Sequence, residues 1–262
     1  MATLRPAMAD DYAAFVRLFP ELRTDDPIPT ADVWVAGIAP ATWVATIEDR
    51  VVAYCYFQEY ADSGYVRHVA VDRAARRQGL GRALLTTVAE RLRRQDKKFW
   101  RLNVKPDNVA AIALYTSLGL KAKYLAKSFR LPWAAFEAMP SLGAVVNLLA
   151  PDRDAAVEDF FSLPRGQLTE SRRIGRTLFE AVTADGGAIL GLAVFNPSFP
   201  GAFPFRVVDP RAARDLLAAM RRMVPKDDNV NLVAEDDEPL ATTLLQVGAL
   251  CKMEIVHMEG AL

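Results

Sequence analysis

The spacing of apolar side chains in the first half of the chain switches between the periods of helices and strands. Apolar residues at positions 12, 15, 16 and 19 have helical spacing, whereas β-rich runs follow after position 41. The expected elements are a strand at Ala2–Pro6, helices at Ala9–Phe19 and Ala31–Ile38, strands at Thr42–Glu48, Val51–Glu59 and Tyr65–Val71, a helix at Leu80–Gln95, a strand at Trp100–Val104, a helix at Val109–Leu118 and a strand at Lys121–Leu131. This order predicts an α/β (α+β layered) domain. We expect Asp49-Arg50 to turn the hairpin between its second and third strands.

The second half repeats this order of elements. The expected elements are a strand at Ala144–Ala150, a helix at Asp154–Phe161, a hairpin of Leu178–Thr183 and Ala188–Phe195, a strand at Phe205–Val208, a helix at Arg211–Met223, a strand at Val230–Ala234, a helix at Leu240–Val247 and a strand at Leu250–Met258. The ends of the two halves align without gaps at an offset of 129 residues, which places Gly248 on Gly119. Few letters are identical, but the shared order predicts an internal duplication.

The chain is therefore expected to hold two domains, at 1–131 and 144–262, joined by a linker at 132–143. Pro132 ends the last strand of the first domain, because a proline cannot donate a hydrogen bond to a strand ladder. The linker contains the apolar residues Trp133, Phe136 and Met139, so we expect it to be packed rather than loose.

The amino-acid composition limits the kinds of molecule that the protein is expected to bind. The 262 residues include 32 Lys and Arg against 32 Asp and Glu, so the zero net charge gives no argument for a nucleic-acid or membrane partner. The two Cys and two His do not have metal-ligand spacing, so we expect no metal site. We expect a reducing, cytoplasmic location, because few cysteines, no signal-like apolar start and no apolar run of membrane-spanning length occur.

One segment combines a strand, a loop with two glycines and a helix. Glycines let a backbone approach a ligand closely, and the first amides of a helix have no intrahelical partner. Such a helix start binds anions, and a pyrophosphate suits it. Four arginines surround the two glycines, Gly79 and Gly81: Arg73, Arg76, Arg77 and Arg82. The alternative is a tight strand–helix turn with a solvated basic rim.

The pattern Arg76-x-x-Gly79-x-Gly81 resembles the pyrophosphate-binding signature of the GCN5-related N-acetyltransferase (GNAT) family. The downstream segment Leu102–Leu120 also resembles this family, in particular the bacterial enzymes that acetylate the N-terminal alanine of a ribosomal protein. The resemblance covers roughly Leu4 to Leu131. It implies two tandem GNAT-like domains, each a mixed, mostly antiparallel sheet flanked by helices.

The resemblance also implies a role for each matching residue. The backbone of Val69, Ala70 and Val71 would pair with the pantetheine arm of acetyl-CoA, as an added strand would. The pyrophosphate would be held by the loop residues Arg76, Arg77, Gln78, Gly79, Leu80 and Gly81, together with Arg82. Asn108 would hydrogen-bond the cofactor arm. Tyr115 would be the general acid towards the departing thiolate, because its hydroxyl is a donor at neutral pH; the alternative is a core aromatic on an amphipathic helix.

The residue that deprotonates the acceptor stays open. The ribosomal-protein enzymes carry a glutamate where this chain has Asn103, which removes the support for a ribosomal substrate. The candidates are Glu59 and His68, and His68 should share a face of its strand with Val66 and Ala70. The alternatives are a hydrogen-bonded structural histidine, a solvated glutamate at a strand end, and a water relay.

The second half lacks the features of the proposed cofactor site. At the offset of 129 residues, Asn108 becomes Asp237, in an acidic run, and Tyr115 becomes Leu244. The junction Val208–Arg214 contains no glycine. Both features disfavour a polyphosphate, so we expect a degenerate domain that does not bind acetyl-CoA. Its expected role is to shape the acceptor cleft or to meet a partner.

The sequence therefore predicts an acetyl-CoA-dependent N-acetyltransferase acting on a primary amine of a small molecule or peptide, as a monomer or homodimer. The alternative is a non-catalytic acetyl-CoA-binding regulator. A Rossmann dinucleotide-binding domain is excluded, because the glycine loop follows the fourth strand and not the first. The identity of the acceptor is left open.

Overall fold

The computed structural model describes residues 2–24 and 26–262, which form two compact units. Unit 1 contains the residues up to Asn103 together with Val109–Lys121 and Met258–Leu262. Unit 2 contains Val104–Asn108 and Ala122–His257. Each unit therefore draws on separate stretches of the chain.

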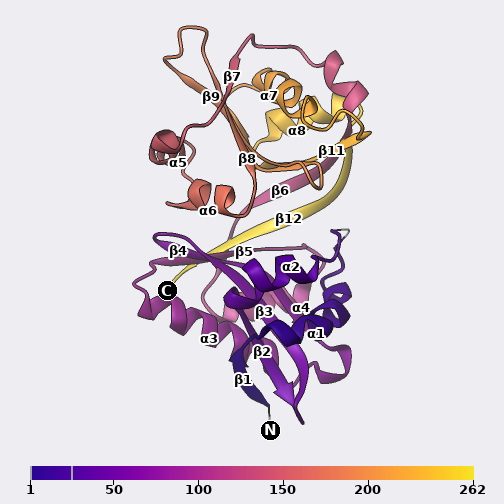
Figure 1. The fold of residues 1–262 in the computed structure, drawn as a ribbon, viewed down its shortest axis with the longest axis vertical. Helices are drawn as coiled ribbons and strands as arrows, with labels where there is room; N and C mark the ends of the chain where they lie inside the picture. Colours follow the sequence, from indigo (N-terminus) through magenta and orange to yellow (C-terminus); the bar gives the residue numbers. More distant parts are fainter. Residues whose placement is uncertain (1, 25) are drawn as a thin grey trace. The chain divides into compact units, whose positions relative to one another are not determined.

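Unit 1 is built on five strands that follow one another in the sheet (Figure 1). The first three pairings are antiparallel, and the pairing of β4 with β5 is parallel. The elements are β1 (Thr3–Pro6), α1 (Tyr12–Leu18), α2 (Ala31–Val33), β2 (Thr42–Ile47), β3 (Arg50–Glu59), β4 (Ser63–Val71), α3 (Leu80–Arg94), β5 (Phe99–Val104) and α4 (Val109–Ser117). This is the mixed, mostly antiparallel sheet that the sequence predicts.

Helices cover both faces of this sheet. On one face, Phe15 of α1 packs against Tyr54 of β3 with ring centroids 5.3 Å apart. On the other face, Arg91 of α3 lies over the ring of Phe57, 5.6 Å from its centroid. Because side chains alternate along a strand, the even-numbered residues of β3 from Tyr54 onward face α1 and the odd-numbered residues from Ala53 onward face α3. These two faces, called the α1 face and the α3 face below, organise the site.

The turn between β2 and β3 differs from the expected one by a residue. Arg50 already pairs with Ile47, so the turn consists of Glu48 and Asp49. Both have left-handed backbones, with φ of 49° and 60°, as a two-residue hairpin turn requires. The expected turn at Asp49-Arg50 is therefore wrong by one position.

Unit 2 repeats the same arrangement. Its elements are β6 (Lys121–Pro132), β7 (Val145–Leu148), α5 (Asp154–Phe160), α6 (Gln167–Arg173), β8 (Thr177–Val182), β9 (Ile189–Asn196), β10 (Gly201–Val207), α7 (Ala212–Arg221), β11 (Asn229–Glu235), α8 (Glu238–Gln246) and β12 (Leu250–Ala261). Three antiparallel pairings from β7 to β10 again precede a parallel one, between β10 and β11. Gly119 and Gly248, which the offset aligns, have matching φ of 91° and 92°. The expected duplication is confirmed.

Two features of unit 2 differ from expectation. Helix α6 is not predicted by the sequence pattern, because Leu168 is the only strongly apolar residue in its first turns and most of its other side chains are polar. Strand β10 begins at Gly201 rather than at Phe205. The sequence pattern missed its first residues, because Pro204 makes the strand look interrupted. The linker is packed as expected, with Trp133 and Met139 each only 2% exposed.

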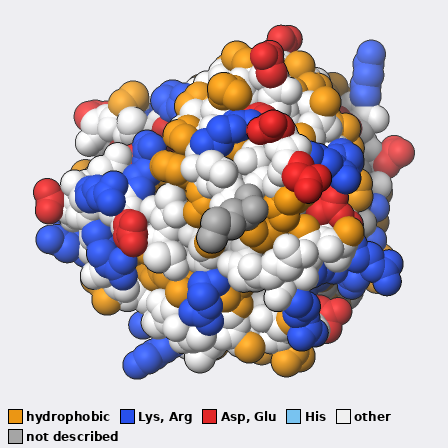
Figure 2. Space-filling view, turned by 90° about the horizontal axis from the view of Figure 1, so that it is seen from below, with side chains coloured by type: hydrophobic (Ala, Val, Ile, Leu, Met, Phe, Trp, Pro, Cys, Tyr) orange, Lys and Arg blue, Asp and Glu red, His pale blue; other side chains and the backbone are white. Residues whose placement is uncertain are grey.

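The face of the molecule shown in Figure 2 carries no single dominant patch of charge. Basic and acidic side chains are interspersed with apolar ones over the face shown in Figure 2. No helix of the described chain is long and apolar enough to cross a membrane.

Candidate active site

Strand β4 parts from β5 about halfway along its length. The parallel register runs from Ser63, opposite Phe99, to Val66, opposite Leu102. Strand β4 nevertheless continues along β3 as far as Val71. The backbone of residues 69–71 therefore lies beyond the parallel ladder, where its polar groups could pair with an extended ligand.

A β-bulge marks the point at which the two strands part. Tyr56 pairs with His68 and the next residue, Phe57, pairs with Val66, so Arg67 is the extra residue of β4. A bulge increases the local twist and redirects side chains. The bulge thus explains both why β4 turns away from β5 and where the Arg67 side chain points.

The loop after β4 has the geometry of an anion cradle. Arg77 and Gly79 both have left-handed backbones, with φ of 65° and 78°, and Gly79 directly precedes the 15-residue helix α3. In the described chain, no side chain caps this helix start, so its first amides stay available for a ligand. A Cβ built on Gly79 would meet open space, whereas one on Gly81 would lie 3.4 Å from Leu114. The loop therefore combines left-handed backbone with uncapped helix amides, which are the features expected of an anion-binding loop.

Two of the expected cations at this loop already have protein partners. Arg76 lies 2.5 Å from Glu21 in an ion pair and also donates to the carbonyl of Val71. Arg82 donates a 2.7 Å hydrogen bond to the Ser117 hydroxyl. A bound anion would compete with Glu21 for Arg76, while Arg73 and Arg77 are exposed.

Asp72 anchors the start of the loop to the rest of the unit. Its carboxylate accepts a hydrogen bond from the Ala74 amide and forms ion pairs with Arg17 at 2.7 Å and Arg50 at 3.1 Å. The amide hydrogen bond and the two arginines hold the pKa of Asp72 below its usual range. These contacts tie the end of β4 to α1 and β3, so they fix where the chain enters the loop.

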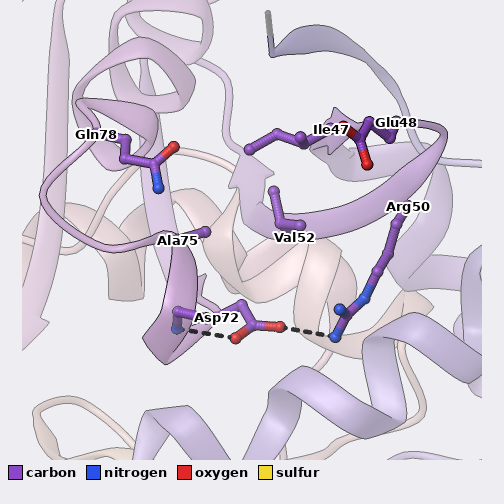
Figure 3. Close-up of a pocket in the computed structure, with 8 residues that line it drawn as sticks. Ile47, Glu48, Arg50, Val52, Asp72, Ala75 and Gln78 are labelled. Carbon is purple, nitrogen blue, oxygen red and sulfur yellow. Dashed lines mark hydrogen bonds and ion pairs between the residues drawn. The ribbon is translucent and has the colours of Figure 1, made fainter.

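A cavity of about 320 Å³ lies beside this anchor (Figure 3). Its lining combines the β2–β3 hairpin with the loop: Ile47, Glu48, Arg50, Val52, Asp72, Ala74, Ala75 and Gln78. Gln78, which the sequence assigns to the cofactor site, therefore also borders this second space.

Tyr115 lies on α4, buried to 8% exposure. Burial, and after it the neighbouring Cys55, raises the pKa of Tyr115 far above its ordinary value, so the hydroxyl keeps its proton. Cys55 pairs with Val69 of β4, and paired residues share a face of the sheet. Tyr115 thus presents a proton donor on the α3 face, near the free stretch of β4. Asn108 directly precedes α4, but it belongs to unit 2, so its role rests on the sequence motif.

His68 lies on the opposite, α1 face, among aromatic rings. The centroids of Phe19 and Tyr56 lie 5.6 and 5.3 Å from its ring. In the described chain, its Nδ1 atom has no hydrogen-bond partner, unlike the hydrogen-bonded structural histidine considered above. Burial, reinforced by Arg67, lowers the pKa of His68 to about 3. The imidazole is therefore neutral at pH 7 and weakly basic.

Glu59 and His68 do not meet. The Glu59 carboxylate accepts a 2.9 Å hydrogen bond from Arg91 of α3, whereas His68 pairs with Tyr56 on the α1 face. Glu59 is therefore engaged in a structural ion pair. The sequence analysis did not include Arg67 among the candidate site residues, because only the register of β3 and β4 identifies it as the bulged residue.

The corresponding part of unit 2 is filled. The parallel register of β10 and β11 ends at Ala202, opposite Leu232. Beyond it, Arg206 lies 2.8 Å from the buried carboxylate of Glu235, which also accepts a hydrogen bond from Tyr124. The counterparts of the two proposed cofactor residues have structural roles as well: Leu244 is fully buried, and Asp237 caps α8.

The buried, neutral His68 predicts a specific sensitivity to acid. An unfolded chain protonates this histidine below about pH 6.5, whereas the folded chain resists protonation down to about pH 3. The contribution of His68 to the free energy of unfolding should therefore be fully present above pH 6.5. Below that pH it should decrease by at most about 1.4 kcal/mol per pH unit. His68→Phe, which suits the surrounding rings, should remove this part of the slope. The measurement is the free energy of unfolding in urea as a function of pH. The same pH dependence in the parent and in His68→Phe would contradict this prediction.

Comparison with known proteins relates the first half of the chain to a family of acetyltransferases. The model of the acetyltransferase (GNAT) family matches residues 9–120. The [ribosomal protein bS18]-alanine N-acetyltransferases of Salmonella typhimurium and Escherichia coli are 34% identical over 84 residues, which is 32% of this chain and 57% of theirs. This chain thus spans little more than half the length of those relatives.

Solved structures extend the likeness of fold to the whole chain. A GCN5-related N-acetyltransferase from Sphaerobacter thermophilus, 16% identical, has a TM-score of 0.67 over 99% of this chain and 95% of its own. A tandem GNAT protein from the clavulanic acid biosynthesis pathway, 18% identical, has a TM-score of 0.64 over 100% of this chain and 98% of its own. The chain has the fold of a tandem GNAT protein, and its residues 9–120 match the model of the acetyltransferase (GNAT) family.

Proposed function

We propose that this protein is an acetyl-CoA-dependent N-acetyltransferase whose catalytic site lies in unit 1 and whose acceptor is a primary amine of a small molecule or peptide. The observation that carries the proposal is the parting of β4 from β5 immediately before a glycine loop and an uncapped helix start. A free strand edge followed by an anion cradle suits a ligand with an extended polar arm and a pyrophosphate.

The residues of unit 1 divide the binding of acetyl-CoA between them. The backbone of Val69, Ala70 and Val71 would pair with the pantetheine arm, and the amides of residues 76–81, with Arg82, would hold the pyrophosphate. The thioester supplies an activated acetyl group. Its carbonyl would lie near the point where the two strands part, and a bound amine would attack it directly in a ternary complex and displace the thiolate of CoA.

Tyr115 would protonate the departing thiolate. Its raised pKa keeps the proton on the hydroxyl at neutral pH, which a general acid requires before the sulfur leaves. The acceptor ammonium must also lose a proton. His68 is neutral but weakly basic and Glu59 is paired with Arg91, so a water relay remains a third route.

The acceptor of this protein need not be the acceptor of the ribosomal-protein acetyltransferases that resemble it in sequence. Those enzymes are named for an alanine of a ribosomal protein. This chain carries Asn103 at the position for which their resemblance leads us to expect a glutamate. We therefore keep the acceptor class at small-molecule or peptide amines.

A non-catalytic acetyl-CoA-binding regulator is the second candidate. The engagement of Glu59 by Arg91 favours it, because an obvious base is then missing. Release of free thiol from acetyl-CoA in the presence of an amine panel separates the two functions. Binding without thiol release from any amine would favour the regulator.

The first prediction concerns the number of sites. Because Arg206 and Glu235 fill the region in unit 2 where the strands part, calorimetry should give one acetyl-CoA per chain. Arg206→Ala should leave that stoichiometry unchanged, because the strand–helix junction of unit 2 at residues 208–214 still contains no glycine to form an anion cradle. A value near two for the parent protein would show that unit 2 also binds the ligand.

The second prediction concerns the cradle. Gly81→Asp should abolish acetyl-CoA binding, because its side chain would enter between Leu114 and Val71 and bring negative charge to the pyrophosphate site. Gly37→Asp is a matched control, since a Cβ there meets nothing within 4 Å. Calorimetry reports affinity, and thermal unfolding checks that both variants fold. Undiminished affinity in a folded Gly81→Asp protein would remove the cradle from the proposal.

The third prediction concerns the proton donor. Tyr115→Phe keeps the ring but removes the hydroxyl, so kcat should fall by about 10²–10⁴-fold while the Kd for acetyl-CoA stays nearly constant. Tyr124→Phe removes a buried hydroxyl from unit 2 and should leave kcat within about twofold, because it lies outside the proposed machinery. If Tyr115→Phe behaves like this control, Tyr115 is a packing residue.

A further inference from the structure

Arg67 differs in its surroundings from most arginines of unit 1. Many of the others form ion pairs with carboxylates: Arg5, Arg17, Arg50, Arg76, Arg91, Arg94 and Arg101. The Arg67 side chain is exposed, and within the described chain its guanidinium is found in no ion pair or hydrogen bond. Its defined contact is with Tyr65, whose ring centroid lies 5.0 Å from the guanidinium carbon. A stacked arginine of this kind keeps its fork of donors for a ligand.

The neighbours of Arg67 form an aromatic wall on the α1 face. Desolvation by the surrounding protein lowers the pKa of Arg67, but Tyr65, Tyr60, Tyr56 and Asp26 together outweigh it and raise the pKa. Tyr60 and Tyr65 are buried at 8% and 7% exposure. The cation is thus accessible to solvent yet closely surrounded by protein, which holds its position.

The location of Arg67 connects it to the acceptor. It precedes His68 in the bulge and comes two residues before Val69, where the free edge of β4 begins. A β-strand advances about 3.3 Å per residue, so the guanidinium lies within the length of a small molecule from this stretch. Tyr115 is on the α3 face and would receive the sulfur there. An acceptor that approaches from the opposite, α1 face would pass Arg67.

We propose that Arg67 binds a carboxylate of the acceptor, so that the substrates of this enzyme are small amines that also carry a carboxylate group. This inference rests on the proposed function, since it assigns the acceptor of the same site. Arginine matches a carboxylate with two parallel hydrogen bonds, and Tyr65 holds the guanidinium plane ready for them.

Matched acceptor pairs test the inference. Thiol release from acetyl-CoA would be measured with 4-aminobutyrate against 4-aminobutyramide and with phenylalanine against phenylalaninamide. Each pair keeps the shape of the acceptor and removes its negative charge. The readout is the ratio of kcat/KM within each pair, compared between the parent and Arg67→Gln, because differences in amine basicity cancel in that comparison.

The parent should favour the carboxylate member of a pair, and Arg67→Gln should lower that preference by about 10- to 100-fold. Arg67→Lys should retain part of it, because the charge stays while the fork is lost. Arg93→Gln, an exposed position on α3, is the matched control and should not change the preference. Thermal unfolding shows whether the bulge tolerates each substitution.

Several results would overturn the inference. They are an unchanged preference in folded Arg67→Gln and Arg67→Lys, a parent that acetylates the amides as well as the acids, and a parent that acetylates only peptide N-termini. Each of these leaves an active acetyltransferase. Acetyl-CoA binding without thiol release from any acceptor would instead overturn the proposed function, and the inference with it.

Discussion

The parting of β4 from β5 is the constraint on which the rest of the proposed site depends. A strand that leaves its neighbour exposes backbone donors and acceptors that must find other partners. Here the strand stays fixed on its other side, because β3 pairs with it as far as Val71, and the bulge at Arg67 sets where the two strands begin to part. The exposed edge is therefore rigid, which suits the binding of an extended ligand.

The two units show how the same opening can be kept or closed. In unit 1, the loop beyond the opening contains Gly79 and an uncapped helix start. In unit 2, Arg206 reaches Glu235, whose carboxylate is almost completely buried and also accepts a hydrogen bond from Tyr124. A buried carboxylate needs such partners to offset its desolvation. The duplicated fold thus survives in unit 2 with an internal ion pair at the corresponding opening.

The sequence allowed most of the fold to be predicted, because its elements are strongly periodic and are repeated. It did not reveal α6, because the buried side of that helix consists of Leu168 and two polar residues and gives no amphipathic pattern. For the candidate site, the motif identified the loop and Tyr115. It could not identify Arg67 as the bulged residue, because a bulge is a property of the register between two strands.

The two faces of the sheet in unit 1 carry different groups of the proposed site. Tyr115 holds a proton beside Cys55 on the α3 face, whereas His68 and Arg67 lie with three tyrosines on the α1 face. Arg67 lowers the pKa of its neighbour His68, so a cation that suits a carboxylate also weakens the nearest base. An acceptor carboxylate bound to Arg67 would offset this effect and raise the basicity of His68 only once the acceptor is in place. The same arginine would then link recognition of the acceptor to removal of its proton.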